Sequence, residues 1–304
     1  MTGYRLATLQ TSMGARAAAI VDNVAFDAAL LTGQERYASV QNILDEWDQS
    51  CDRLEVAAKN PGCRGIPVNE AKFLAPLPRP RVIYCAGANY RDHAEEMASI
   101  GGKPAADPRA DGARPWFFLK SPHSVVAPGA TLHVTQYGRL IDWEAELVVI
   151  IGRKARYVSV NEALDVVAGY TCGNDISARD HVFRSSLPAV SPFRADWMRH
   201  KSFDDACPMG PWIVPARYVS DPARLSIRLW VNDELKQDST TGQMIFSIAE
   251  QIAYLSESIT LHPGDAIMTG TPAGVGASRG EFLKSRDVVR VEIADIGALR
   301  NLVS

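Results

Sequence analysis

Short apolar runs separated by turn-forming residues dominate the chain after residue 80 and predict strands. β-branched and aromatic residues fill segments 81–87, 115–120, 143–152, 210–216, 225–236, 265–272 and 287–303. Asn232-Asp233, between strand-like flanks, predicts a hairpin turn. Apolar residues at helical spacing predict helices over 161–170 and 247–259. Strands and helices do not alternate regularly, which indicates a β-rich α+β fold.

The first part of the chain has a different pattern. Strand-like runs at 4–10 and 15–21 precede segment 39–60, whose apolar residues recur at helical spacing. Three prolines between residues 76 and 80 then favour an extended connector. We therefore expect a small N-terminal domain over 1–75 and a larger domain over 76–304.

Composition and charge narrow the class of partner. The 304 residues carry a formal net charge of −3, so no excess of positive charge is available to bind a nucleic acid. The apolar runs are too short to cross a membrane, and the first residues lack the apolar core of a signal peptide. The five cysteines are scattered, as in a protein with reduced thiols. We expect a cytoplasmic protein that binds a small molecule.

Segment 101–115 is nearly all Gly, Pro, Ala, Asp and Arg. Such a composition buries little surface, so the segment is expected to be a surface loop. A lid over a binding site and a disordered insertion are both compatible with it.

Acidic residues alternate along the segment "IDWEAELVVIIG". In a strand, Asp142, Glu144 and Glu146 point to one side. Like charges so close repel one another, and burial beside an apolar run increases the cost of ionisation unless a cation is present. The alternative is a solvated acidic face. The apolar continuation of the strand, together with Asp175, favours a metal site.

The stretch "GYTCGNDISARD", residues 169–180, supplies that further carboxylate. Glu144, Glu146 and Asp175 form an all-oxygen set, which suits Mg²⁺, Mn²⁺ or Ca²⁺ rather than zinc or copper. Arg179 can bind a carboxylate of this cluster or of a substrate. It can equally form an ion pair with Asp175 or Asp180.

Two further motifs could take part in chemistry. In "GANYRDHAEEM", His93 and Glu96 are three residues apart and share one face of a helical turn. A carboxylate behind an imidazole raises its basicity, although a surface pair has the same spacing. In "MTGTPAGVG", the glycines predict a tight turn at which Thr271 can offer its hydroxyl and N–H to an anion.

These motifs, in this order along residues 80–304, resemble the fumarylacetoacetate hydrolase superfamily, especially its acylpyruvate hydrolase and oxaloacetate decarboxylase branch. The motifs include "FFLKSP", "KSFDDACPMGPWIV" and "LWVNDELKQ". The resemblance implies a catalytic domain with a mixed β-sheet roll, usually dimeric. This chain departs from the family pattern at Ala88, where many acylpyruvate hydrolases have Arg, and at Val182, where they have Gln. The chemical group at the far end of the substrate is therefore not predicted.

The resemblance also implies a role for each site residue. It assigns the metal, Mg²⁺ or Mn²⁺ with Ca²⁺ as a possible occupant, to Glu144, Glu146 and Asp175. It assigns catalysis to His93, Glu96 and Lys120, and substrate binding to Arg179, Lys201 and Thr271.

The predicted reaction is hydrolysis of a C–C bond in a β-diketo acid of the acylpyruvate or fumarylpyruvate type, giving pyruvate and a carboxylic acid in aromatic catabolism. A metal that stabilises a pyruvate enolate also suits other reactions. They are decarboxylation of oxaloacetate and isomerisation, decarboxylation or hydration of a 2-oxo-dienoate. The alternative outside enzyme function is a protein of the same fold that binds a ligand without catalysing a reaction.

Overall fold

A strand buried on both faces carries the apolar run that follows the acidic residues. In the computed structural model, which describes residues 3–100, 102 and 107–304, β11 (Ala145–Ile151) pairs with β12 (Val167–Asn174) and β17 (Ala266–Met268). Leu147 and Val149 of β11 belong to one apolar core, whereas Val148 and Ile150 belong to a second. A strand packed on both faces reads as a continuous apolar run, which explains this part of the sequence.

β11 lies within a large sheet. Its strands follow the order β4 (Ile66–Pro67), β3 (Val24–Asp27), β2 (Gly14–Val21), β1 (Arg5–Thr11), β14 (Cys207–Pro215), β12, β11, β17, β6 (Ile83–Ala86) and β7 (Phe117–Lys120). β5 (Phe73–Leu74) pairs with β1, and β8 (Val125–Val126) pairs with β14. The N-terminal strands join the sheet where β1 pairs with β14. The domain boundary near residue 75 stays a prediction.

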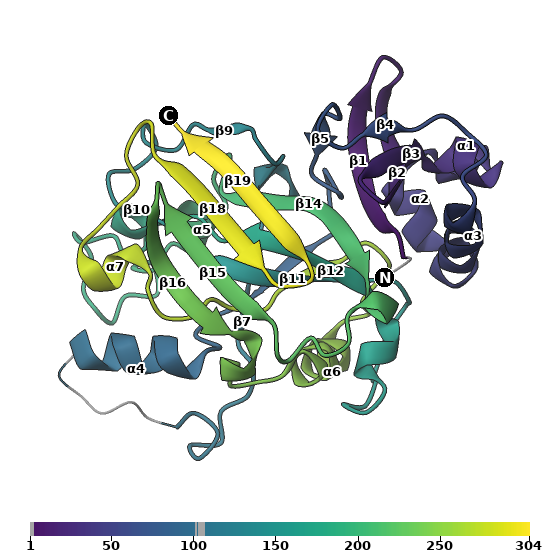
Figure 1. The fold of residues 1–304 in the computed structure, drawn as a ribbon. Coiled ribbons are helices and arrows are strands. Elements are labelled where there is room, and N and C mark those ends of the chain that lie inside the picture. The colour runs from purple at the N-terminus through teal and green to yellow at the C-terminus, as the bar shows by residue number, and fades with distance from the viewer. Residues whose placement is uncertain (1–2, 101, 103–106) are drawn as a thin grey trace.

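A second sheet packs against the first and encloses the core that contains Leu147 and Val149. Its order is β16 (Glu234–Thr240), β15 (Ser226–Val231), β18 (Val288–Ile293), β19 (Gly297–Val303) and β9 (Thr131–Leu132). In Figure 1 its green and yellow strands lie in front of β11 and β12. The predicted hairpin is confirmed, because β15 and β16 meet at Asn232, whose φ is +57°. A short ladder joins β10 (Ile141–Asp142) to β13 (Ser177–Ala178).

Helices cover the sheets and carry part of the site. They are α1 (Ala28–Thr32), α2 (Val40–Asp45), α3 (Trp47–Lys59), α4 (Arg91–Ile100), α5 (Trp197–Lys201), α6 (Ile248–Ser258) and α7 (Gly276–Arg279). 3₁₀ turns occupy Glu35–Ala38, Pro122–Ser124, Ala163–Val166, Arg179–His181, Ala216–Tyr218 and Thr241–Gln243. α6 begins with a capping box of Ser247 and Glu250 and confirms the predicted helix there. The β-rich α+β fold is also confirmed.

The helix predicted over 161–170 is wrong. Only Ala163–Val166 form a 3₁₀ turn, and β12 begins at Val167. β12 pairs with β11 on one side and with β14 on the other. Pairing on both sides and complete burial override the helical spacing of a short valine-rich segment, which fits either element.

The loop before β7 is attached to α6 by two arginines. Arg109 binds Glu250 at 2.8 Å, and Arg114 binds Glu257 at 2.6 Å. Residues 101 and 103–106 of this predicted loop lie outside the described residues, and its role as a lid stays a prediction. In the described part of the chain, no helix has both the length and the apolar character needed to cross a bilayer.

Gly169 allows β12 and β14 to approach closely, which gives a prediction about stability. A Cβ at Gly169 would lie 2.2 Å from the carbonyl oxygen of Val214, a backbone atom that cannot rotate away. Gly169→Ala should therefore lower the free energy of unfolding by about 1–3 kcal/mol, measured by urea denaturation. Gly62→Ala is the matched control, because no atom lies within 4 Å of its Cβ. Equal stability of the two variants would contradict the packing argument.

Candidate active site

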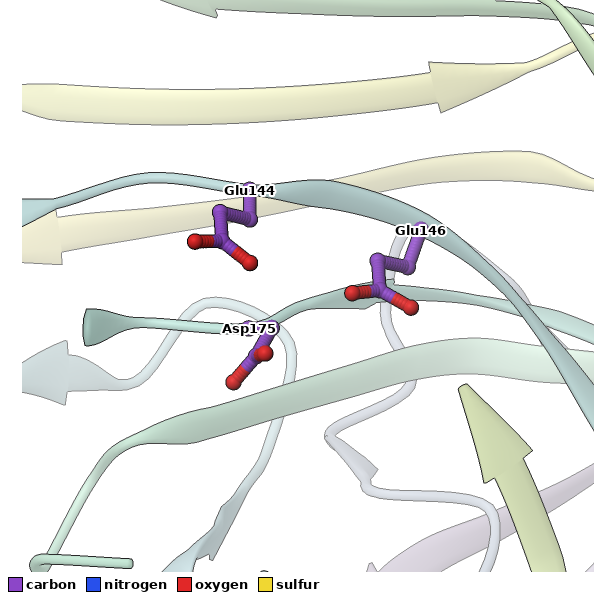
Figure 2. Close-up of side chains that lie close together, drawn as sticks. All are labelled: Glu144, Glu146 and Asp175. Carbon is purple, nitrogen blue, oxygen red and sulfur yellow. The ribbon is translucent and has the colours of Figure 1, made fainter. Parts of the chain in front are cut away.

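Three buried carboxylates from two neighbouring strands converge on one point. Glu144 precedes β11, Glu146 lies on β11, and Asp175 follows β12. Oxygens from the three side chains lie within 4.8 Å of one another, and Figure 2 shows them pointing toward a common centre. The strand pairing dictates this arrangement, because the Asp175 N–H donates to the carbonyl oxygen of Glu144 at 2.8 Å.

Two buried lysines neutralise part of this charge. Lys120 donates to Asp175 at 2.5 Å, and Lys201 donates to Glu144 at 2.8 Å and to Asp175 at 2.6 Å. Burial alone would raise the pKa of Glu144, but Lys201 and Arg179 hold it well below its usual range. Glu144 is therefore held as a carboxylate anion.

Glu146 forms no ion pair with a lysine or arginine in the described part of the chain. Its Oε2 accepts a hydrogen bond from the Gly270 N–H at 2.7 Å. Burial, then the nearby charges of Asp175 and Glu144, raise the pKa of Glu146 well above its usual range. A divalent cation would relieve this repulsion, and a buried set of three carboxylates fits a hard cation such as Mg²⁺ or Mn²⁺. Glu144, Glu146 and Asp175 are the residues that could hold it.

Asp142 does not join the cluster, contrary to the prediction that it shares its face. The strand pattern is broken at Trp143 and Glu144, between β10 and β11. Asp142 accepts hydrogen bonds from the N–H groups of Gly276 at 2.6 Å and Ala277 at 3.0 Å. Its carboxylate is therefore used to hold the first residues of α7.

Arg179 links Asp142 to the cluster. Its Nε donates to Asp142 at 2.8 Å and its Nη2 donates to Glu144 at 2.5 Å. Arg179 therefore binds a carboxylate of the cluster, which is one of the two arrangements that the sequence left open. The alternative partner Asp180 instead accepts from the N–H of Arg139. Binding of substrate by Arg179 stays a prediction.

His93 and Glu96 lie on one face of α4, as their spacing predicts. Nδ1 of His93 is 3.6 Å from Oε2 of Glu96, and both side chains are largely buried. Glu96 also accepts from the Gly274 N–H at 3.0 Å and from Oγ of Ser278 at 2.7 Å. Burial alone would raise the pKa of Glu96, but these partners hold it below its usual value. The arrangement leaves Nε2 of His93 as the ring nitrogen that faces away from the carboxylate.

The turn 270–277 organises both parts of the site. Its N–H groups hold Glu146 of the carboxylate cluster, Glu96 of the pair and Asp142. Thr271 lies in this turn and is buried. Its hydroxyl oxygen accepts a hydrogen bond from Gln237, and anion binding by Thr271 stays a prediction.

Gln237 and Ser177 complete the arrangement and were missed from the sequence. Gln237 is fully buried on β16; its amide oxygen accepts from the Ala145 N–H and its amide nitrogen donates to Thr271. Ser177 donates to Glu144 at 3.1 Å. A polar residue in an exposed-looking hairpin strand gives no signal of such a contact. The position of Ser177 beside Asp175 is a weak signal.

Comparison with known proteins identifies the family. Residues 82–304 match the model described as "Fumarylacetoacetate (FAA) hydrolase C-terminal". The rat protein "Oxaloacetate tautomerase Fahd2a, mitochondrial" (Rattus norvegicus) is 35% identical over 93% of this chain and 83% of its own. That relative is named as mitochondrial, so the cytoplasmic location predicted for this chain remains untested.

Two solved structures share the fold. Maleylpyruvate hydrolase from Sphingobium sp. SYK-6, in complex with manganese(II) and pyruvate, is 30% identical with a TM-score of 0.75, over 98% of both chains. The 2-hydroxyhepta-2,4-diene-1,7-dioate isomerase from Mycobacterium marinum is 30% identical with a TM-score of 0.72, over 99% of this chain and 98% of that one. The manganese-bound relative and the carboxylate cluster together indicate a divalent metal site.

Glu146 provides a direct test of that site. Glu146→Ala should weaken Mg²⁺ binding by about 100-fold, because one of three charged ligands is lost. Isothermal titration of the metal-free protein measures this affinity. Glu95→Ala, an exposed acid on α4, is the matched control and should bind Mg²⁺ like the parent. Undiminished affinity in Glu146→Ala would contradict the assignment.

The pH dependence of metal binding gives a second test. Because the pKa of Glu146 is raised, the metal-free site holds a proton at pH values at which an ordinary glutamate is ionised. A cation must displace that proton, so Mg²⁺ affinity should rise with pH until this pKa is passed and then level off. Titrations in two buffers of different ionisation enthalpy should reveal the release of about one proton per cation. Equal affinity across this range, with no buffer dependence, would show that Glu146 is already ionised.

Proposed function

The chain belongs to the fumarylacetoacetate hydrolase family, and on that premise we propose that it is an enzyme that interconverts the keto and enol forms of a 2-oxo acid. Oxaloacetate is the first candidate substrate. The relative named oxaloacetate tautomerase, similar over nearly the whole chain, supports this choice of compound. The observation that carries the proposal is the His93–Glu96 pair beside the buried carboxylates.

Proton transfer at the carbon next to the 2-oxo group is the central step of this reaction. In the keto form that carbon carries the proton, and in the enol form the proton is on the oxygen. A divalent cation held by Glu144, Glu146 and Asp175 would act as a Lewis acid toward the 2-oxo carboxylate. We assign His93 as the base that takes the carbon-bound proton on Nε2, while the enolate oxygen takes a proton from water to give the enol and the imidazolium gives its proton back to water. In the reverse direction the enol loses its O–H proton to water, and Nε2 delivers a proton to the carbon.

The environment of His93 supports this role. Glu96 faces Nδ1 and would stabilise the imidazolium that forms when Nε2 takes a proton. His93 also lies close enough to Glu144 for its charge to lower the pKa of that carboxyl. The base therefore borders the carboxylate cluster, where a bound 2-oxo acid would present its reactive carbon.

Lys120 and Lys201 have a supporting role in this proposal. Both ammonium groups are buried against the carboxylates. They would keep the ligand carboxylates ionised and offset the negative charge of the substrate. Direct contact of Lys120, Lys201, Arg179 or Thr271 with the substrate remains part of the proposal.

Hydrolysis of a β-diketo acid is the second candidate, and the same pair supports it. His93 would take a proton from water, the resulting hydroxide would attack the distal carbonyl, and the bond between that carbonyl carbon and the adjacent carbon would break. The products would be a carboxylic acid and the enol form of pyruvate. The relative named maleylpyruvate hydrolase favours this reaction. A homodimer, which the family resemblance implies, also stays a prediction.

A pair of substitutions tests the base. With Mg²⁺ present, the parent should accelerate conversion of enol oxaloacetate to its keto form. The loss of the enol absorbance measures this rate. His93→Ala should lower the rate by about 100-fold or more, and Glu96→Gln by about 10-fold, because water can partly replace Glu96 in orienting the imidazole. Mg²⁺ affinity should stay within about twofold of the parent in both variants.

The matched control is His123→Ala, which removes an exposed histidine from another element. It should retain the activity of the parent. A parent protein that leaves enol oxaloacetate unchanged but releases pyruvate from acetylpyruvate would favour the second candidate. Near-parent rates of His93→Ala in both assays would overturn the assignment of the base.

A further inference from the structure

A cluster of aromatic side chains lies at the surface beside the lysines of the site. The ring centroid of Trp197 is 5.0 Å from that of Trp116 and 5.4 Å from that of Phe118. Trp116 is 47% exposed and Trp197 is 39% exposed. Tryptophan gains much from burial, so two neighbouring, half-exposed indoles mark a surface suited to contact with a ligand.

Two of these aromatics, Phe118 and Trp197, lie on elements that also carry a lysine of the site. On β7, Phe118 is two residues before Lys120 and therefore lies on the same face of the strand. On α5, Trp197 is four residues before Lys201 and lies on the same face of the helix. α5 packs on β7, and Nζ of Lys201 is 5.2 Å from the ring centroid of Phe118. The aromatic cluster therefore lies next to the lysines, which in turn contact the carboxylates.

The cluster also reaches the segment that leads to the base. A Cβ at Gly87 would lie 1.8 Å from Cζ3 of Trp116, so the indole ring rests directly on the backbone of Gly87. Gly87 begins the stretch that continues into α4 and His93. Trp116, Phe118 and Trp197, hereafter the aromatic wall, therefore extend from the lysines to the start of the base-carrying segment.

We propose that the aromatic wall binds the far end of the substrate and selects 2-oxo acids that carry an apolar or aryl group beyond the reacting carbon. This inference rests on the proposed function, which requires the 2-oxo carboxylate to lie at the carboxylate cluster. A planar group would stack on the exposed indoles and remove their surface from water. Ala88, which follows Gly87, offers no charge to attract a distal carboxylate. Oxaloacetate would then be accepted without using the wall.

Two inert ligands that differ by one ring test the wall. Oxamate and N-phenyloxamate share a carboxylate next to a carbonyl, and each has an amide nitrogen in place of the reacting carbon. Isothermal titration of the full-length parent in Mg²⁺ should give about tenfold tighter binding of N-phenyloxamate. In the double variant Trp116→Ala/Trp197→Ala the two ligands should bind about equally, with the affinity for oxamate within about twofold of the parent.

The control Phe193→Ala removes an aromatic side chain that is 70% exposed and should keep the tenfold preference. A double variant that keeps the preference, or that weakens both ligands equally, would overturn the inference. A double variant that keeps the preference but dissociates from dimer to monomer would show that a second copy covers the wall instead. Failure of the parent both to bind oxamate and to convert enol oxaloacetate would overturn the inference and the proposed function together.

The oxaloacetate assay separates the two proposals. If the parent converts enol oxaloacetate but shows no phenyl preference, the proposed function stands and the aromatic wall does not. If it shows the preference without converting oxaloacetate, the proposed reaction fails while the subsite stands. The double variant should convert oxaloacetate at a rate within about threefold of the parent.

Discussion

The carboxylate cluster can exist in the protein interior only because cations balance it. Buried carboxylates are costly unless they are paired, and the chain directs Lys120, Lys201 and Arg179 at this point from three different elements. These three cations can neutralise Glu144, Asp175 and Asp142, which leaves Glu146 without an ion pair among the residues that the structure describes. A divalent cation would complete the balance. The positions of β7, α5 and the segment after β12 are therefore tied to one electrostatic requirement.

The two halves of the proposed chemistry share a single backbone support. The turn 270–277 holds Glu146 through one N–H and Glu96 through another, while a third holds Asp142. Backbone donors have no rotamer freedom, so they fix a carboxylate more tightly than a long side chain can. The distance between the carboxylate cluster and the His93–Glu96 pair is thereby set by a few residues of one turn.

The sequence predicted the parts of the molecule that depend on local pattern. The apolar run of β11, the hairpin at Asn232 and the spacing of His93 and Glu96 all follow from short-range periodicity. It failed where tertiary contacts decide. The valine-rich segment before Tyr170 became a strand because partners lie on both sides. Gln237 could not be predicted, because its partners come from two distant segments. The aromatic wall likewise requires α5 to pack on β7.

The residues proposed for catalysis and the aromatic wall lie on different parts of the fold. The residues that we propose for metal binding and proton transfer depend on β11, α4 and the turn 270–277, whereas the aromatic wall comes from β7, from Trp116 just before it and from α5. Substitutions in the aromatic wall leave the shared backbone support untouched. Exchange of surface side chains alone could therefore change which substrates an inherited catalytic centre accepts. Each intermediate in such a series would keep its catalytic residues and so remain active.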